Sequence, residues 1–133
     1  MTPVYSKVAE RALDRCEYCH APEIVFNLPL EMDHIVPRSQ GGDDALDNLS
    51  LACRACNLFK SDFETGIDRE GGMEASLFHP RRDVWTEHFR IDLERAEVVG
   101  ISAIGRATVR RLQMNRPHQI NARRHWMQLG LFP

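Results

Sequence analysis

Apolar and polar positions along the chain follow a helical period in some segments and a strand-like alternation in others. Helices are predicted over residues 3–14, 103–114 and 116–129, where apolar residues fall on one helical face. A further helix is predicted over residues 55–63, directly after the second cysteine pair begins. The residues predicted to cap three of these helices are Thr2, Ser102 and Asn115. Segments rich in β-formers or with strand-like alternation are residues 24–28, 30–36, 49–52, 85–91 and 97–101.

The order of these segments predicts an α+β fold in two parts. Residues 1–63 are predicted to hold a β-hairpin followed by a helix, with a polar loop over 38–48 that pivots on Gly41-Gly42. Residues 64–133 are predicted to add a second hairpin and two helices that pack on the first part. Glycines and charged residues leave 64–83 without a clear pattern, so this stretch is predicted to be a linker or a loop that faces the substrate.

The four cysteines form two Cys-x-x-Cys pairs, Cys16/Cys19 and Cys53/Cys56, which use every cysteine of the chain. Two such pairs supply four thiolates, the set that tetrahedral zinc prefers. The alternatives are two disulfides or free thiols in the core. We expect a structural zinc ion that holds both ends of the first part together, because a module of this size is rarely stable by packing alone.

Charge is distributed unevenly along the chain, although the net charge is only −2. All acidic residues lie within the first 97 positions, and residues 98–133 carry six arginines. A basic tail of this kind indicates an anionic partner, or alternatively a tail that packs on the acidic part. No apolar run of 18 residues and no signal-peptide pattern are present, which predicts a cytoplasmic protein without a membrane span.

The stretch between the cysteine pairs carries groups suited to phosphodiester hydrolysis. His34 is a candidate general base, because histidine exchanges protons near neutral pH. Asp33 offers a carboxylate and Asn57 an amide oxygen, the hard ligands that a divalent cation requires. Glu31 lies two residues before Asp33 on the same strand face and is a candidate to support the cation indirectly. Regular strand geometry would separate Asp33 from His34, so a strand end is expected here.

Residues 16–60 resemble the HNH endonuclease family. The resemblance rests on Cys16, Cys19, Asp33-His34-Ile35-Val36-Pro37, Gly41-Gly42, Asn48-Leu49, Cys53, Cys56, Asn57 and Lys60. It implies a ββα-metal module in which His34 is the general base, Asp33 and Asn57 bind the catalytic cation, and Asn48 braces the loop that holds the histidine. Asn57 stands where the family name expects histidine, and this oxygen ligand favours Mg²⁺ or Mn²⁺ over Ni²⁺ or Zn²⁺.

The predicted function is therefore metal-dependent cleavage of DNA, most simply of one strand of a duplex by a monomer. Candidate contacts to DNA phosphates are Arg38, Lys60, Arg106, Arg110, Arg116, Arg123 and Arg124. Arg38 and Lys60 are equally explained as surface charges, and Asn57 as the start of a helix. The alternatives for the whole chain are a zinc-held binding module without chemistry and an accessory nickase of a phage or mobile-element assembly.

Overall fold

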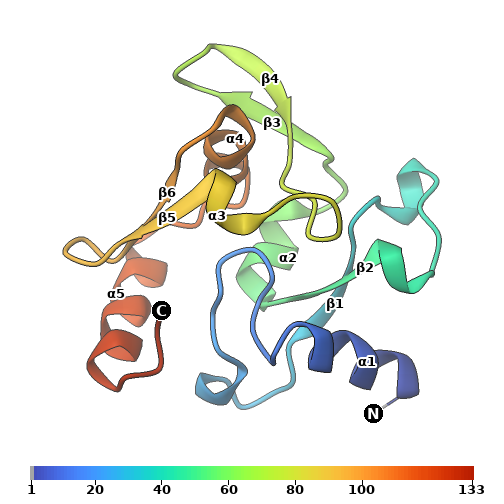
Figure 1. Cartoon of the computed structure of the whole chain (residues 1–133), viewed down its shortest axis with the longest axis horizontal. Helices are drawn as coiled ribbons and strands as arrows, with labels where there is room; N and C mark the ends of the chain where they lie inside the picture. Colours follow the sequence, from blue (N-terminus) through green and yellow to red (C-terminus); the bar gives the residue numbers. More distant parts are fainter. Residues whose placement is uncertain (1) are drawn as a thin grey trace.

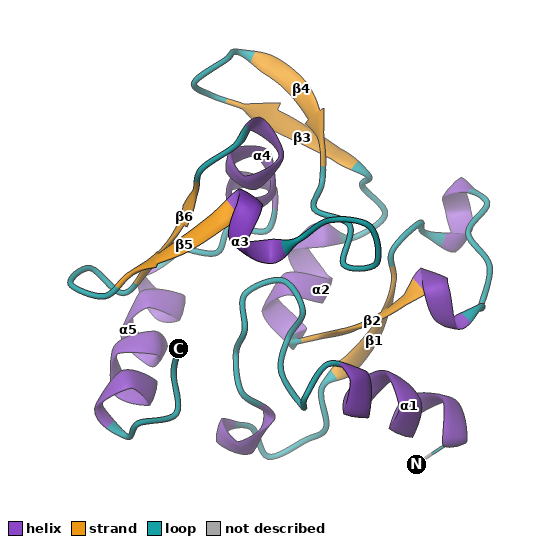
Figure 2. Cartoon of the chain, viewed as in Figure 1, coloured by secondary structure: helices purple, strands orange, loops and turns teal. Residues whose placement is uncertain are grey.

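Three antiparallel β-hairpins and five α-helices make up the part of the chain that the structure describes (Figures 1 and 2). The computed structural model describes residues 2–133. The α-helices are α1 (Pro3–Arg11), α2 (Arg54–Lys60), α3 (Trp85–His88), α4 (Ala103–Arg111) and α5 (Pro117–Gln128). The strands are β1 (Glu31–His34), β2 (Leu49–Ala52), β3 (Thr65–Asp68), β4 (Met73–Ser76), β5 (Phe89–Asp92) and β6 (Glu97–Gly100). This mixture confirms the predicted α+β class.

The first hairpin and α2 form the predicted ββα unit. β1 pairs with β2 in a register that sets Glu31 opposite Ala52 and His34 opposite Leu49. α2 begins two residues after β2 and packs against β1. His34 is the last residue of β1, as expected from Pro37 just beyond it. The hairpin therefore delivers the histidine to the point where the strand gives way to the loop.

Two local predictions for the N-terminal part differ from the structure. α1 ends at Arg11 and not at residue 14, because Leu13 and Asp14 turn the chain with left-handed φ angles of 55° and 54°. The predicted strand over 24–28 is wrong, since this segment contains a 3₁₀ turn (Glu23–Val25) and pairs with no strand. β-propensity without a neighbouring strand edge does not make a strand, and Ile24 is largely exposed.

Residues 64–83 are not a linker, because β3 and β4 pair here as a hairpin. The turn between these strands ends at Gly72, which has a left-handed φ of 71°. A Cβ atom on Gly66 would lie 2.9 Å from the carbonyl oxygen of Ala107, so this glycine lets β3 lie directly against α4. The same glycines that weakened the sequence pattern therefore make the hairpin and its packing possible.

The C-terminal part contains a hairpin, β5–β6, and the two predicted helices, α4 and α5. The strand predicted over 85–91 is wrong in its first half, because Trp85–His88 form the helix α3 and β5 begins only at Phe89. Ser102 caps α4 as predicted, with its Oγ accepting a hydrogen bond of 3.0 Å from the Gly105 amide. The predicted cap at Asn115 is wrong. Its side chain instead exchanges two hydrogen bonds with the backbone of Val98 on β6 (2.9 and 2.8 Å), and α5 begins at Pro117.

One core joins the two predicted parts. Buried side chains from α1 and β2 meet others from the segments that flank α3 and α4, including Val8, Leu51, Phe89 and Met114. α4 forms a bridge within the C-terminal part, because it packs against β3, β4 and β6. No helix among residues 2–133 is long and apolar enough to cross a membrane.

Candidate active site and metal centre

The four cysteines meet in one buried cluster, although 33 residues separate the two pairs. Their sulfur atoms all lie within 4.8 Å of one another, and those of Cys19 and Cys53 are 3.7 Å apart. Disulfide sulfurs lie about 2.05 Å apart, so the cysteines are free thiols. Sulfurs around a tetrahedral zinc ion, each bonded at about 2.3 Å, would be roughly 3.8 Å apart. The cluster therefore fits a zinc ion.

Hydrogen bonds within the cluster favour the same conclusion. The amides of Cys19 and Cys56 point at the sulfurs of Cys16 and Cys53, each at 3.5 Å, as expected of two knuckles that support thiolates. Hydrogen bonding to Cys16 lowers the pKa of Cys53 and raises the pKa of both Cys19 and Cys56. Four buried sulfurs cannot all ionise together unless a cation neutralises them, and a dication supplies that charge.

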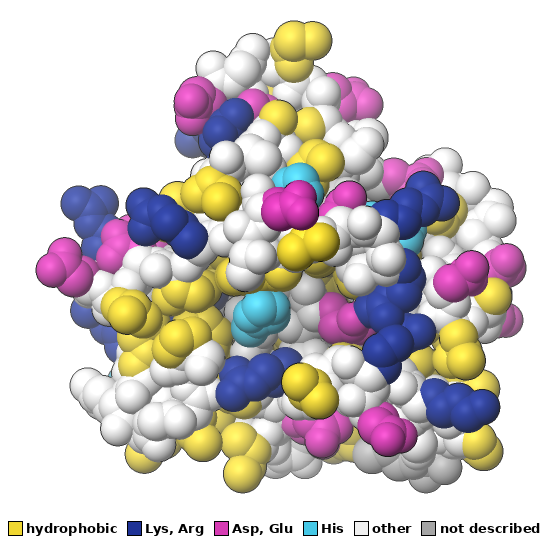
Figure 3. Space-filling view, in the orientation of Figure 1, with side chains coloured by type: hydrophobic (Ala, Val, Ile, Leu, Met, Phe, Trp, Pro, Cys, Tyr) yellow, Lys and Arg dark blue, Asp and Glu magenta, His cyan; other side chains and the backbone are white. Residues whose placement is uncertain are grey.

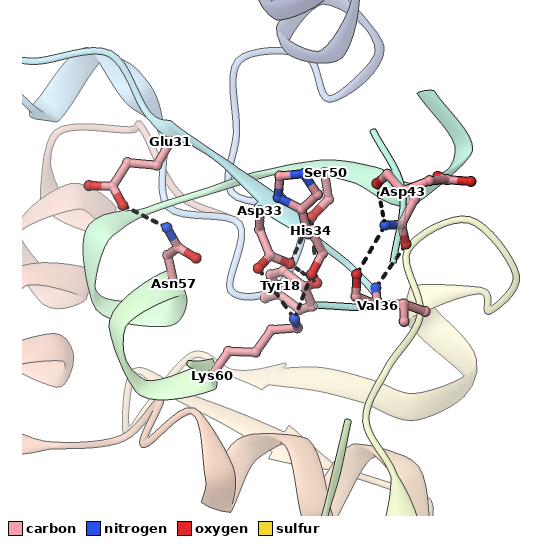
Figure 4. A network of polar contacts seen from close by, with 10 residues as sticks. Tyr18, Glu31, Asp33, His34, Val36, Asp43, Ser50, Asn57 and Lys60 are labelled. Atoms are coloured by element: carbon pink, nitrogen blue, oxygen red, sulfur yellow. Dashed lines mark hydrogen bonds and ion pairs between the residues drawn. The ribbon is translucent and has the colours of Figure 1, made fainter. Parts of the chain in front are cut away.

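The segment between the first two cysteines contacts, through Tyr18, the strand that carries the candidate catalytic residues (Figure 4). Tyr18, between Cys16 and Cys19, donates a hydrogen bond of 2.7 Å from its hydroxyl to Asp33. Ser50 on β2 donates to the same carboxylate at 3.3 Å, and Lys60 on α2 lies 3.3 Å from its other oxygen. Burial raises the pKa of Asp33, although the Lys60 ammonium opposes that rise.

Asp33 and Lys60 thus form an internal ion pair, with exposures of only 4% and 1%. Lys60 also donates a hydrogen bond of 3.0 Å to the His34 carbonyl oxygen, which ties α2 to the end of β1. The expectation that Lys60 is a surface charge or a phosphate contact is wrong, because its ammonium is enclosed. The carboxylate of Asp33 is likewise fully engaged, so this arrangement does not fit the predicted role of an accessible cation ligand.

We expect Lys60→Met to destabilise the fold by about 3–5 kcal/mol near neutral pH, because it leaves a buried carboxylate without its cation. The pKa of Asp33 is higher in the folded than in the unfolded protein, so protonation of this carboxyl stabilises the fold. That stabilisation is fully present below the unfolded-state pKa and is lost as pH rises through the folded-state pKa. The penalty should therefore shrink toward about pH 4. Urea unfolding at both pH values measures it, and Arg54→Met, an exposed cation of the same helix, is the control.

Asn57 offers a more accessible oxygen on α2. Its amide nitrogen donates a hydrogen bond of 2.7 Å to the carboxylate of Glu31, which is 35% exposed and lies 3.5 Å from Arg54. This bond occupies one Glu31 oxygen and orients the Asn57 carbonyl oxygen away from that carboxylate. A carboxylate and an amide oxygen are ligand types that Mg²⁺ accepts.

His34 lies at the surface beside the glycine-containing loop. Its Nε2 is 2.8 Å from the carboxylate of Asp44, and Arg38 lies 2.9 Å from the same oxygen. The hydrogen bonds to His34 and Arg38 lower the pKa of Asp44, so this carboxylate is charged near neutral pH. A partner on Nε2 holds the ring in place, and Nδ1 has no hydrogen-bond partner among residues 2–133.

Asn48 holds the loop in the manner that the resemblance implied. Its side-chain oxygen accepts a hydrogen bond from the Val36 amide (2.8 Å), and its nitrogen donates to the carbonyls of Val36 (3.0 Å) and Asp43 (2.8 Å). Gly41 has a left-handed φ of 89°, and a Cβ on Gly42 would collide with the Val36 carbonyl. The glycine pair and Asn48 together fix the loop segment that ends in Asp44.

The predicted phosphate contacts fall into different environments. Arg110 and Arg116 are exposed, and both line a groove of about 760 Å³. Arg106 lines it too, but its guanidinium forms two hydrogen bonds with Asp68 (2.8 and 3.0 Å). Arg124 is exposed on α5. The expectation for Arg123 is wrong, since this side chain is 1% exposed and donates to backbone carbonyls.

Sequence reasoning missed three residues that support the candidate site: Tyr18, Asp44 and Ser50. Tyr18 was detectable only as an aromatic residue enclosed between two cysteines. Asp44 lies in the polar loop ten residues after His34, where several acidic residues look equivalent. Ser50 lies opposite Asp33 in the β1–β2 register, a pairing that becomes readable once the hairpin is aligned.

Comparison with known proteins points to the same region of the chain. A family model described as HNH endonuclease matches residues 16–63, from the first cysteine to just beyond α2. Searches of curated proteins and of solved structures found no match. The matched segment contains the four-cysteine cluster, the ββα unit, His34 and Asn48. Over residues 16–63, the chain therefore carries a domain of the HNH endonuclease family.

Proposed function

We propose that the protein is a zinc-stapled, metal-dependent endonuclease that hydrolyses phosphodiester bonds of double-stranded DNA. The observation that carries this proposal is the placement of His34, a partly exposed imidazole held by Asp44 at the end of β1 beside the loop braced by Asn48. A binding module has no need of a histidine oriented in this way. One such histidine per chain supports nicking of one strand in each encounter.

In the proposed reaction, His34 accepts a proton from water through Nδ1 as the water oxygen bonds to phosphorus and the bond from phosphorus to the leaving oxygen breaks. Asp44 keeps the ring in place and stabilises the imidazolium that forms, because its charged carboxylate lies against Nε2. Asn48 maintains this geometry through the loop and does not touch the reactants. A divalent cation, Mg²⁺ or Mn²⁺, would neutralise charge on the phosphate and on the leaving oxygen when bound.

We assign that cation to the oxygens of Asn57 and Glu31. Asp33 does not bind it and instead forms the buried ion pair with Lys60. This revises the pair implied by family resemblance, Asp33 and Asn57, on the ground of exposure. The Asp33 carboxylate has three protein partners and almost no contact with solvent. Glu31 and Asn57 lie on the accessible part of the same β1–α2 face.

Glu31→Gln should raise the Mg²⁺ concentration needed for half-maximal nicking by about tenfold, because a neutral amide binds a hard cation less well than a carboxylate. Asp33→Asn should act mainly on stability. Titration of nicking with Mg²⁺, together with a melting curve for each variant, separates the two effects. A higher Mg²⁺ requirement in a stably folded Asp33→Asn protein, with Glu31→Gln unaffected, would return the ligand role to Asp33.

The groove beside α4 is the proposed contact for the DNA backbone. Its charged lining residues are Arg69, Glu70, Arg106, Arg110 and Arg116, which come from the β3–β4 turn, α4 and the segment between α4 and α5. Within residues 2–133, Arg69, Arg110 and Arg116 form no ion pair, so they are available to phosphates. Figure 3 shows basic side chains interspersed with acidic ones on the face it displays.

Replacing both Arg110 and Arg116 by glutamine should weaken DNA binding and reduce its dependence on salt. Each lost phosphate contact lowers the slope of log affinity against log salt by about 0.9, so we expect a decrease of about 1.8. Fluorescence anisotropy with a labelled duplex at several salt concentrations measures the slope. Arg90→Gln, an exposed arginine on β5 outside the groove, should leave it unchanged.

A further inference from the structure

Arg123 is the most deeply enclosed cation of α5, and its surroundings are unusual. The guanidinium donates hydrogen bonds to the carbonyls of Ala96 (2.7 Å) and Met114 (2.8 Å), and it lies 3.3 Å from the side-chain oxygen of Asn115. Its Nε has no partner. No carboxylate of residues 2–133 lies within ion-pairing distance of this side chain. Carbonyl groups satisfy donors, but they do not neutralise a buried charge.

Cysteines of the cluster line the same small cavity as Arg123. Arg123 lines an apolar space of about 200 Å³ together with Cys19, Cys53 and Cys56, three of the four clustered cysteines. The remaining wall is largely hydrophobic, with Leu112, Met114 and Trp126 among its residues. Burial lowers the pKa of Arg123, and the charges that oppose this are those of the three cysteines, ahead of Glu97. Electrostatic attraction is strong across such an apolar space.

Zinc bound by four thiolates carries a net double negative charge, which is costly to enclose without a counter-ion. We propose that Arg123 is the counter-ion of the zinc–tetrathiolate cluster, so that α5 stabilises bound zinc without touching it. The inference rests on the zinc site of the proposed function but is independent of nuclease activity. It gives the C-terminal helix a role in metal retention, where the basic tail alone suggested a contact with DNA.

Zinc retention in the full-length protein tests this role. The test compares wild type with Arg123→Met, which removes the charge, Arg123→Lys, which keeps it while changing the hydrogen bonds, and Arg124→Met, an exposed control. The readouts are zinc affinity by competition with a chromophoric chelator and the rate of zinc transfer to it. We expect Arg123→Met to weaken zinc binding about 10- to 100-fold, as outer-shell changes do. The zinc affinities of the Arg123→Lys and Arg124→Met proteins should stay near that of wild type.

Each of the other outcomes would contradict either the counter-ion role of Arg123 or the zinc site on which it rests. Wild-type protein that purifies without zinc, and does not take it up, would refute the zinc site itself. A zinc-loaded Arg123→Met protein with wild-type affinity would refute the counter-ion role alone. Equal weakening in the Met and Lys variants would assign Arg123 to hydrogen bonding with Ala96 and Met114, which also overturns the proposal. If Arg123→Met does not fold, Arg123→Gln replaces it as the neutral variant under the same criteria.

Discussion

Removing zinc from the four-cysteine cluster is expected to unfold the protein. Structural zinc contributes about 10–16 kcal/mol in small domains, whereas whole domains are stable by only about 5–15 kcal/mol. The cluster joins the segment after α1 to the start of α2, and Tyr18 extends from it to the buried Asp33. Its loss should therefore disorganise both the core and the candidate site.

Far-UV circular dichroism and thermal melting, before and after a strong chelator, measure this effect. Zn²⁺ added back should restore the cooperative melt, and Mg²⁺ should not, because thiolates select the softer ion. Cys53→Ser should behave as the chelated protein does, since Cys53 both belongs to the cluster and caps α2. A metal-free protein that melts within a few degrees of wild type would contradict a structural role for zinc.

Replacement of His34 by alanine is expected to lower nicking about 10²–10⁴-fold while leaving zinc content and stability near wild type. His34 is at the surface, and the neighbouring loop is held by Asn48 and the glycine pair, so the fold does not depend on the imidazole. A single-turnover nicking assay under saturating Mg²⁺ isolates the chemical step. His125→Ala is the matched control, because this exposed histidine of α5 lies outside the HNH domain.

Asp44→Asn tests the same part of the account by a smaller change. The amide keeps the side-chain shape but removes the charge beside His34 Nε2, so we expect a slower reaction in a protein that still folds. Its effect should vanish in the His34→Ala background, because Asp44 acts only through the imidazole. Additive losses in the double variant would show that Asp44 acts on DNA or on the cation directly.

Local chemistry allowed much of the HNH domain to be predicted from sequence. The two Cys-x-x-Cys pairs indicated one four-cysteine metal site. The β1–β2 hairpin was predicted from two strand patterns on either side of a polar loop. The Ser102 cap of α4 depends only on a hydrogen bond to the residue three positions later. These features depend on residues whose spacing along the chain fixes their spacing in the fold. The match to the HNH family over residues 16–63 falls within the stretch where such rules apply.

Predictions failed where a side chain's role depends on distant parts of the chain. Lys60 and Arg123 look like surface cations in their helices, but packing encloses both, one against Asp33 and the other near the cysteine cluster. Asn115 is a plausible helix cap by sequence, yet β6 takes its hydrogen bonds. Gly66 and Gly72 suggested a linker by sequence. In the fold, Gly66 allows β3 to lie against α4, and Gly72 adopts the left-handed φ of the turn between β3 and β4.

The most direct test of the account is nicking of supercoiled plasmid by the zinc-loaded protein, with and without added Mg²⁺ or Mn²⁺. The buffer should contain no strong chelator, so that structural zinc remains bound and only the catalytic cation varies. We predict relaxed circles that form only with the added cation and that do not form with His34→Ala. A zinc-loaded, DNA-binding protein that leaves the plasmid intact with both cations would contradict the proposed endonuclease and favour a zinc-held binding module.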